Sequence, residues 1–568
     1  EFRRVLFRSV VARTYNPVQT ADGALTGSHR DSDGYQGRNW FQNSQPELSY
    51  NDTGTAGPTA GDVVYLVYGA DRTVEFAHAS GNDFKGKNGA AGIVQYVSGS
   101  PDTWVYTDQM GNKATFFGGN TSSGAADWQF WKTADEAGNT IYVGDKTTAS
   151  TAVTNGYSGK RITTAYDQAD RRYTYTYTTI DSVARLTQVK AETRTGGTWA
   201  SPTGLATVGQ VDYTYYQTGD TTHGDSGNLR TVKVTTPLSD GTTNLESETY
   251  YRYYTGTYNA TTNPGSAYQI KMIVGPEGTR KYDWDQDGNL DDDYLTASTD
   301  ALKPYSDAYL TYYDVTDSDT AVPARVKSVF MNGQCGCSGG GGNGTYTYTF
   351  ETNSGYTNNA GYDTAWFRRA VVTEPGGKWT TQYVDEAGQP LSRVITTATP
   401  SGTPTTFWAT QAVRNSNGQL TEIWSPASIT AYMHTLASVA FTQGSTGLVT
   451  LFNRVGSGNM TGFLSSEAWK NGSGGSDSKI HEWTYGSATI TVGSQTLVRP
   501  QISGATKYER TGSLLAYAYS SSMTTTVASG RITDKNRTSS TPTPTTGNNG
   551  SGSASTTASN LSDDKIHA

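Results

Sequence analysis

The stretch RRYTYTYTTIDSVARLTQV (171–189) decides the fold. Tyr173, Tyr175 and Tyr177 alternate with threonine, so the three phenol rings project from one face of an extended chain. Alternation with a period of two over several residues is the pattern of a half-buried β-strand. The polar residues from Asp181 to Ala184 interrupt this pattern, and a second alternating run comes after them. Two strands joined by so short a turn predict an antiparallel β-hairpin.

The same unit recurs along the chain. A polar turn with Asp or Asn three residues before Gly separates further alternating segments, and its copies are Asp108–Gly111, Asp135–Gly138, Asp285–Gly288, Asp385–Gly388 and Asn415–Gly418, with a diverged candidate at Glu509–Gly512. The acidic or amide side chain can cap such a turn, and Gly adopts the positive φ that closes it. The repeat predicts an all-β fold, an array of antiparallel β-hairpins that forms a long curved or spiralling sheet.

Composition agrees with this fold class and excludes several others. The 568 residues include 38 Tyr and 64 Gly, but only 17% are charged. The net charge of −8 disfavours binding to nucleic acid. No run of 18 apolar residues is present, so we expect no membrane-spanning segment. Helical periodicity is weak, and its clearest instance runs from Ser428 to Ala440.

The chain divides into four segments by composition. Residues 1–9 (EFRRVLFRS) do not match the rest of the chain and are interpreted as a non-native scar, and residues 10–59 as an N-terminal irregular or β segment. The hairpin repeats extend over 60–520. Residues 533–568 are rich in Thr, Ser and Gly, and no aromatic residue occurs after Tyr519. A segment with so little apolar surface to bury is expected to be a linker or loop.

The segments TEPGGKWTTQYVDEAGQPLSRV (373–394) and GPEGTRKYDWDQDGNL (275–290) resemble Rhs/YD repeats. Their shared pattern is a Gly turn, an alternating strand ending in Tyr-Asp or a close variant, and a returning strand after x-x-Gly. The stretch TWVYTDQMGNKATFFGGN (103–120) is similar to the first hairpin of such arrays. The resemblance covers about 60–520, and it lacks the terminal segment of the family with its Asp-Pro-x-Gly motifs.

The resemblance implies a function as well as a fold. In the bacterial Rhs family the repeats form a hollow shell around a toxin domain or present a large extracellular surface. It therefore implies a non-catalytic structural shell or surface scaffold that is secreted or located at the cell surface. Its partner would be a C-terminal effector of the same parent chain, which is absent from this fragment.

One acidic motif has the spacing of a calcium loop. In DWDQDGNLD, Asp283, Asp285 and Asp287 occupy loop positions 1, 3 and 5, Gly288 occupies position 6, and Asn289 and Asp291 occupy positions 7 and 9. Position 12, which usually supplies a bidentate acid, is Tyr294. The motif predicts a weak Ca²⁺ site, and an acidic hairpin turn is the alternative.

Catalytic motifs are missing from the sequence. The six His residues show no H-E-x-x-H spacing, and no G-x-S-x-G elbow links a strand to a helix. Cys335 and Cys337 lie in a Gly-rich stretch and have no assigned role. The chain is therefore predicted not to be an enzyme and to need no cofactor other than calcium. Two alternatives stay open: an extracellular carbohydrate-binding adhesin that uses exposed Trp residues to bind cell-surface glycans, and an enzyme that acts on polysaccharides.

Overall fold

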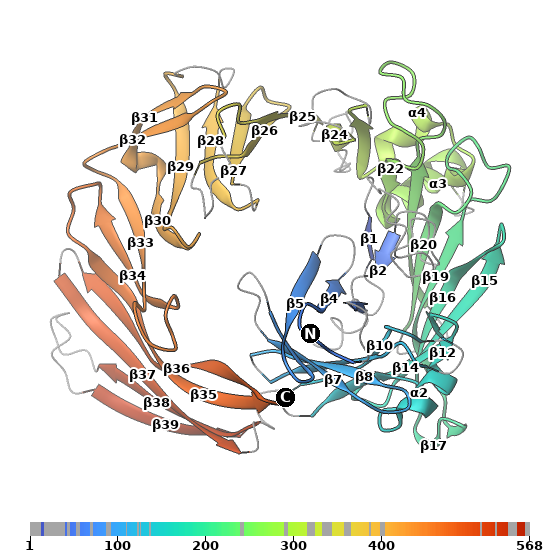
Figure 1. Cartoon of the computed structure of the whole chain (residues 1–568). Coiled ribbons are helices and arrows are strands. Elements are labelled where there is room, and N and C mark those ends of the chain that lie inside the picture. Colours follow the sequence, from blue (N-terminus) through green and yellow to red (C-terminus); the bar gives the residue numbers. More distant parts are fainter. Residues whose placement is uncertain are drawn as a thin grey trace. The chain divides into compact units, whose positions relative to one another are not determined.

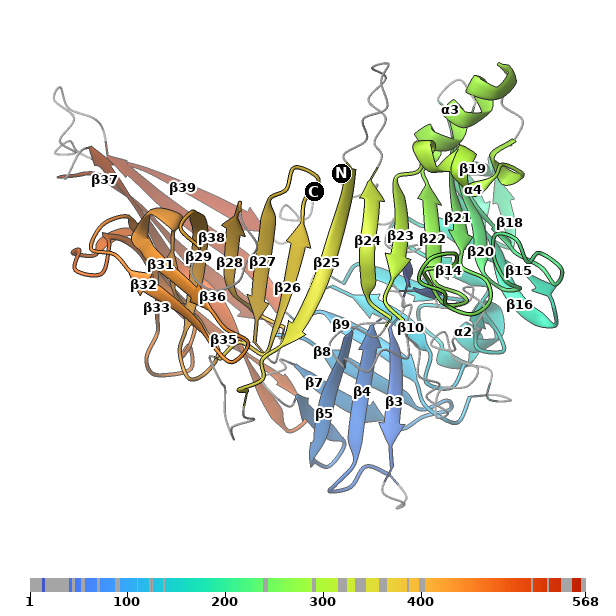
Figure 2. The ribbon, with the colours of Figure 1, turned by 90° about the horizontal axis from the view of Figure 1, so that it is seen from above.

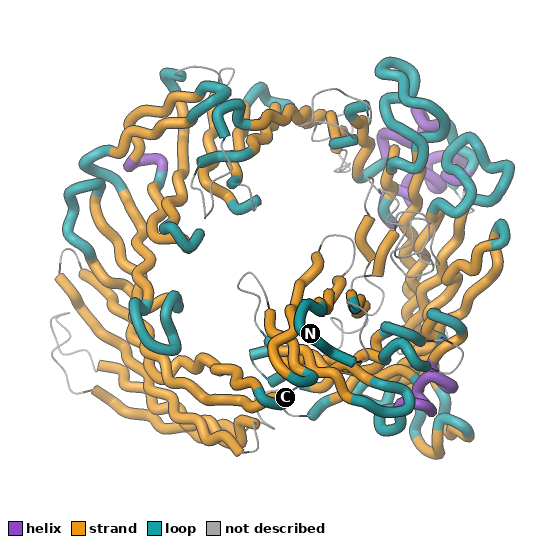
Figure 3. The backbone as a smooth tube through the Cα atoms, in the orientation of Figure 1, coloured by secondary structure: helices purple, strands orange, loops and turns teal. Residues whose placement is uncertain are grey.

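The structure is a computed structural model. It describes residues 13–15, 40–42, 46–52, 57–68, 72–86, 92–109, 111–121, 124, 126–135, 138–238, 244–288, 293–314, 324–331, 344–356, 365–385, 388–397, 404–511, 514–528, 531–542 and 554–562. Strands contain 55% of the residues and helices 9% (Figure 3). The expected all-β class is confirmed. No helix among the described residues is long and apolar enough to cross a membrane.

The chain forms two compact units. Unit 1 consists of Glu1–Val315, Met331–Gly342 and Ile490–Leu497, and unit 2 of Thr316–Phe330, Asn343–Thr489 and Val498–Ala568. In both units, most strands pair antiparallel with their neighbours in the sequence (Figure 1).

Unit 1 contains an antiparallel meander with short insertions. Its main strands are β3 (Glu47–Asn51), β4 (Val63–Tyr68), β5 (Arg72–Ser80), β6 (Asp83–Gly86), β7 (Ile93–Val97), β8 (Thr103–Thr107), β9 (Lys113–Phe117), β10 (Phe130–Ala134), β11 (Thr140–Val143), β14 (Thr164–Tyr166), β15 (Arg172–Ile180), β16 (Val183–Thr193), β19 (Ala206–Tyr215), β20 (Leu229–Pro237), β21 (Asn244–Tyr253), β22 (Ile270–Val274) and β23 (Ala308–Tyr312). The smaller pairs are β1 (Arg13–Tyr15) with β2 (Trp40–Gln42), β12 (Tyr157–Ser158) with β13 (Arg161–Ile162), and β17 (Gly196–Thr198) with β18 (Ser201–Thr203). The helical elements are α2 (Ala149–Gly156), α3 (Pro276–Asp287), η2 (Asp293–Leu295), α4 (Thr299–Leu302) and η3 (Lys303–Tyr305).

Unit 2 repeats the meander with longer strands at its C-terminal end. Its strands are β24 (Val326–Met331), β25 (Gly344–Thr352), β26 (Arg368–Thr373), β27 (Trp379–Val384), β28 (Pro390–Thr396), β29 (Phe407–Arg414), β30 (Leu420–Trp424), β31 (Ile429–His434), β32 (Val439–Gln443), β33 (Leu448–Arg454), β34 (Leu464–Asn471), β35 (Ser478–Val492), β36 (Gln495–Thr511), β37 (Leu514–Ala528), β38 (Arg531–Pro542) and β39 (Ala554–Ser562). β24, β35 and β36 each also include residues that belong to unit 1. A 3₁₀ turn, η4 (Pro426–Ser428), precedes β31. Figure 2 shows β25 to β28 side by side, in agreement with their hydrogen-bonded pairing.

The alternating tyrosines face the core as the sequence predicts. Tyr173 and Tyr175 on β15 are buried, whereas Thr176, the residue after Tyr175, is exposed. Tyr213 and Tyr215 on β19 belong to the same core cluster of unit 1. Each pair of buried aromatic rings in such a core contributes about 0.5–1.5 kcal/mol beyond the area that it buries.

The repeated turns have one hydrogen-bond pattern. At Asp385, the carbonyl oxygen accepts from the Gly388 amide at 3.1 Å, and the Oδ1 atom accepts from the Gln389 amide at 2.7 Å. The same two bonds recur at the predicted turns that begin at Asp108, Asp135 and Asn415. A side-chain oxygen thus holds each turn closed from inside, and this part of the sequence prediction is confirmed.

β-Bulges lie beside two of these four turns, those that begin at Asp385 and Asn415. Tyr383 and Val384 are consecutive residues of β27, and they pair with Ser392 and Pro390 of β28. Leu391, between these two partners, is therefore the extra residue of the bulge. A bulge bends its strand and increases the local right-handed twist. The bulges give each meander curvature and redirect the side chains next to the turns.

Two predicted elements are corrected by the structure. Residues 275–290, expected to form a hairpin around Asp285–Gly288, contain the helix α3. Pro276 at the first helical position and Glu277 in the first turn favour helix initiation, and Gly288 at φ 83° ends the helix. The helix that the apolar spacing suggested at 428–440 was also wrong. These residues lie in the β31–β32 hairpin, in which Tyr432 pairs with Phe441.

Strands occur in both segments that flank the expected repeat region. β3 lies inside the segment 10–59, which was expected to be irregular or β. The paired strands β38 and β39 overlap the segment 533–568, which was expected to be a linker or loop. Residues 1–9 lie outside the described residues.

Candidate ligand-binding pocket

The structure places the described part of the predicted calcium motif on a helix. Asp283 is buried on α3, and its Oδ1 atom accepts a hydrogen bond from the Tyr294 amide at 3.2 Å. Asp285 is exposed, and its Oδ2 atom accepts from the Tyr305 hydroxyl at 2.9 Å. Residues two apart on a helix point about 200° from each other. The two carboxylates therefore do not converge on one ion in this conformation.

The remaining residues of the motif add no described ligand. Asp287 is the last residue of α3, and Asn289 and Asp291 lie outside the described residues. Among the residues that the structure describes, no group of three or more His, Cys, Asp or Glu side chains could hold a metal ion. The Ca²⁺ site stays a prediction. Cys335 and Cys337 also lie outside the described residues.

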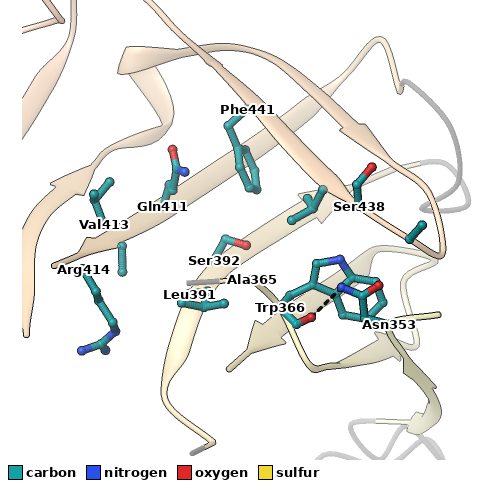
Figure 4. A pocket seen from close by; sticks show the side chains of 13 residues that line it. Asn353, Ala365, Trp366, Leu391, Ser392, Gln411, Val413, Arg414, Ser438 and Phe441 are labelled. Carbon is teal, nitrogen blue, oxygen red and sulfur yellow. Dashed lines mark hydrogen bonds between the residues drawn. The ribbon is translucent and has the colours of Figure 1, made fainter. Parts of the chain in front are cut away.

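Unit 2 contains a pocket that the sequence did not predict. It has a volume of about 340 Å³ and is lined by residues that come after β25, precede β26, begin β28, end β29 and form the β31–β32 hairpin. Figure 4 shows Ser392, Trp366 and Phe441 approaching one space from three of these elements, with Gln411 beside Phe441. Ligand sites typically have volumes of about 300–1,000 Å³, so this pocket has room for a single small ring.

Trp366 is one of the lining residues, and its side chain is only 2% exposed. The Asn353 Nδ2 atom donates to the Trp366 carbonyl oxygen at 2.7 Å, and the Asn353 Oδ1 atom accepts from the Gly355 amide at 2.8 Å. The indole also packs edge-on against Tyr383, with ring centroids 5.6 Å apart. Asn353 and Tyr383 therefore hold the indole in a fixed position.

Phe441 on β32 is another lining residue. Its ring stacks on Tyr432 of β31 with a centroid distance of 5.4 Å. The Ser354 amide donates to the Leu436 carbonyl oxygen at 2.9 Å and so ties this hairpin to the end of β25. The hairpin that sequence periodicity assigned to a helix thus supplies an aromatic wall.

Several residues of the pocket lining contain a buried polar atom that has no hydrogen-bond partner in the described part of the chain. These atoms are the Oγ atom of Ser392, the Nε1 atom of Trp366, the Oε1 atom of Gln411 and the Nε atom of Arg414. Ser392 is 4% exposed and pairs across the sheet with Gln411, so their side chains share one face. A buried polar atom without a partner costs about 1–3 kcal/mol.

The pocket rests on a buried polar network. Arg369 donates to both carboxylate oxygens of Glu351 at 2.7 Å and, through Nη1, to the Tyr383 hydroxyl at 3.5 Å. The Tyr383 and Tyr432 hydroxyls lie 2.5 Å apart. Burial opposes the charge of Arg369, but its bonds to Glu351 and Tyr383 raise its pKa. The guanidinium therefore stays charged beneath the pocket.

His434 packs against both Trp366 and Tyr383, with ring centroids 5.7 and 5.6 Å away. Burial, reinforced by the charge of Arg369, lowers the pKa of His434 from 6.5 to about 4. Glu351, 3.9 Å from the Nε2 atom, opposes this shift only partly. His434 is therefore neutral at physiological pH and acts as a packed ring.

The exposed tryptophans that the sequence suggested as a sugar-binding surface lie elsewhere. Trp284 on α3 is 60% exposed, and Trp408 and Trp469 in unit 2 are 48% and 46% exposed. None of the three lines the pocket. Trp366, the tryptophan that lines the pocket, lies outside the strands. No local sequence pattern marks it as a pocket residue.

Comparisons with known proteins give limited information. No protein-family model matches the chain, and no curated protein matches it. The crystal structure of TcdB2-TccC3-Cdc42 has 9% identity and a TM-score of 0.25, and the match covers 90% of this chain and 29% of that one. The Tc holotoxin pore of Photorhabdus luminescens has 10% identity and a TM-score of 0.26, with 91% and 29% covered. A porin-like protein from Bacteroides uniformis has 12% identity and a TM-score of 0.16, with 70% and 97% covered.

The chain thus spans less than a third of the length of the first two proteins. With TM-scores below 0.5, none of these likenesses supports an inference about this chain.

Proposed function

We propose that the chain is a non-catalytic structural scaffold of the Rhs/YD-repeat kind, secreted or located at the cell surface. The observation that carries this proposal is the repeated turn, in which Asp or Asn closes successive hairpins in both units through the same pair of hydrogen bonds. Repeats that contact mainly their neighbours build extended surfaces rather than a single compact active site. The function implied by the repeat is to enclose or present another domain.

The lining of the pocket supports a non-catalytic role. Among the described residues, the lining includes no Asp or Glu, and Arg414, a charged residue of the lining, donates to the carbonyl oxygens of Gly418 and Pro390 at 3.0 and 3.3 Å. Glycoside hydrolases need two carboxyl groups that flank the scissile bond. The geometry of this pocket therefore suits binding better than hydrolysis, which weighs against the polysaccharide-enzyme alternative.

The enclosed partner would be a C-terminal effector of the parent chain. The test is to fuse a protease-sensitive reporter domain after Ala568 and, as a matched control, the same reporter before Glu1. We expect the reporter after Ala568 to be cleaved at least tenfold more slowly. Equal cleavage of the two fusions would contradict enclosure, and hydrolysis of any polysaccharide by the chain would contradict a non-catalytic scaffold.

A further inference from the structure

We propose that residues 490–497 are a releasable clasp in unit 1. They form the tip of the β35–β36 hairpin and belong to unit 1, whereas the rest of both strands belongs to unit 2. Inside unit 1 the tip docks on β5, β6 and β7, and the two bonded partners at its centre are 411 residues apart in the sequence. When the tip is released, the paired strands of the meander stay intact. The inference goes beyond the scaffold role and does not depend on it.

One carboxylate is the main anchor of the tip. Asp83 on β6 is 3% exposed, and its Oδ2 atom accepts hydrogen bonds from both the amide and the hydroxyl group of Ser494, each at 2.7 Å. Its Oδ1 atom accepts from the Nε2 atom of Gln95 on β7 at 3.0 Å, which orients the carboxylate. Hydrogen bonds to a carboxylate are stronger than those between neutral groups. Removal of this acceptor should therefore loosen the tip.

The other polar contacts of the tip depend on the same carboxylate. Because the Ser494 hydroxyl donates to Asp83, the Ser80 hydroxyl, whose Oγ atom lies 2.8 Å from that of Ser494, is the donor in this second pair. The Ser80 Oγ atom in turn accepts from the Gln495 Nε2 atom at 3.0 Å. A carboxylate can only accept, so Asp83 sets the direction of the whole chain of bonds.

The apolar contact of the tip is small and separate from the main core. Val492 and Leu497, on either side of the turn, form a buried cluster with Ile93 of β7. None of the three belongs to the large core cluster of unit 1. Hydrophobic stabilisation is roughly proportional to the apolar area that is buried. So small a contact can open locally while the core stays packed.

The turn at the tip requires glycine. Gly493 and Ser494 connect β35 to β36, and Gly493 has φ of 58°. A Cβ atom at this position would overlap the Asp83 carboxylate and the Gln95 amide, so a side chain at position 493 pushes the tip off its anchor. Gly81, between β5 and β6, has a similar φ of 53°, but no described atom lies within 4 Å of an added Cβ. Gly81→Ala is therefore a matched control that carries the backbone strain alone.

Amide hydrogen exchange of the full chain, followed by mass spectrometry, measures release of the tip. We expect residues 490–497 to exchange at least about tenfold faster than β16, at a rate that low concentrations of urea hardly change. Local opening exposes little surface and so depends weakly on urea, whereas global unfolding depends on it strongly. If the tip exchanged with the urea dependence of β16, it would leave its site only when the chain unfolds, and the proposal would be overturned.

Two variants test the anchor. Asp83→Asn keeps the size of the side chain but replaces one acceptor oxygen by a donor group, and it should raise exchange of the tip by on the order of tenfold relative to β16. Gly493→Ala should raise this ratio at least as much, and Gly81→Ala should leave it unchanged. A general loss of stability raises exchange of both segments and leaves the ratio unchanged. Equal ratios in Gly493→Ala and Gly81→Ala would contradict a docked tip.

A disulfide tests the docked state directly. The Oγ atoms of Ser80 and Ser494 are 2.8 Å apart, so Ser80→Cys and Ser494→Cys together bring two sulfur atoms close enough to bond. Cys335 and Cys337 are replaced by serine in the same chain. We expect mild oxidation to form the cross-link and to slow exchange of the tip at least about tenfold relative to the reduced chain. Failure to form the cross-link, or a cross-link that leaves exchange of the tip unchanged, would overturn the proposal.

Discussion

The hydroxyl oxygens of Tyr383 and Tyr432 lie 2.5 Å apart, although 49 residues separate the two in the sequence. Tyr383 also receives a hydrogen bond from Arg369. Burial raises the pKa of both phenols, so both stay protonated and one donates to the other. This bond joins β27 to the hairpin that carries Phe441, one of the residues that line the pocket.

Replacing either tyrosine should destabilise unit 2. Tyr383→Phe leaves the buried Tyr432 hydroxyl without this bond, and we expect a loss of about 1–2 kcal/mol in the free energy of unfolding. Tyr432→Phe should cost a similar amount. The double variant should be more stable than the sum of the single losses predicts, by at least about 0.5 kcal/mol. Chemical denaturation monitored by tryptophan fluorescence measures all three, and strict additivity would disprove the coupling.

Stability should fall as the pH decreases from about 6.5 to about 4. The pKa of His434 is lowered to about 4 in the folded chain, chiefly by burial, so unfolding lets the imidazole take up a proton throughout this window. The unfolded state binds more protons there, and the resulting loss is on the order of 3 kcal/mol at its low end.

The comparison is with His434→Phe, which keeps a ring packed against Trp366 and Tyr383 but cannot titrate. Burial also lowers the pKa of His223 in unit 1, but His223 is present in both the unmodified chain and the variant. The difference between the two proteins in how stability depends on pH therefore reports His434 alone. Parallel profiles between pH 4 and 6.5 would show that His434 does not contribute.

Replacing the glycine of a repeated turn by alanine should lower the stability of the chain. Gly388 has φ of 77° and open space around its Cα atom, so Gly388→Ala should cost about 1 kcal/mol from backbone strain alone. Gly376, in a neighbouring turn, has equally open space and an ordinary φ. Gly376→Ala should be neutral or slightly stabilising. Thermal denaturation of both variants tests this difference, and equal melting temperatures would contradict it.

The helical conformation of α3 predicts no specific response to calcium. The Asp283 carboxylate already accepts from the Tyr294 amide, and Asp285 points away from it. Millimolar Ca²⁺ should therefore shift the melting temperature of the unmodified chain and of Asp285→Ala by the same small amount. A saturable shift that disappears in Asp285→Ala would instead establish the predicted calcium loop and require the end of α3 to rearrange.

The strands were predictable because their signal is local. Tyr173 and Tyr175 alternate with threonine, and Asp385 lies three residues before Gly388, so neighbouring residues alone encode the strand and the turn. The segment 283–288 shows the limit of this approach. Its Asp and Gly spacing suits a calcium loop, a hairpin turn and a helix end equally well. Pro276 and Glu277, at the other end of α3, decide between them.

The pocket was not predictable because its residues are distant in sequence. It combines Trp366, Ser392, Gln411 and Phe441, each from a different element. None of them belongs to a motif, and the hairpin that carries Phe441 has apolar spacing that also fits a helix. Only the cross-strand pairing of Tyr432 with Phe441 shows which face points inward.

The meander also determines how the chain can fold. Because most strands pair with the preceding one across a short turn, each new strand can be added to an existing sheet edge without closing a long loop. Local connectivity of this kind favours rapid assembly compared with other all-β topologies. A chain that emerges with its N-terminus first, from a ribosome or through a narrow channel, could thus build its sheet in order, one strand at a time.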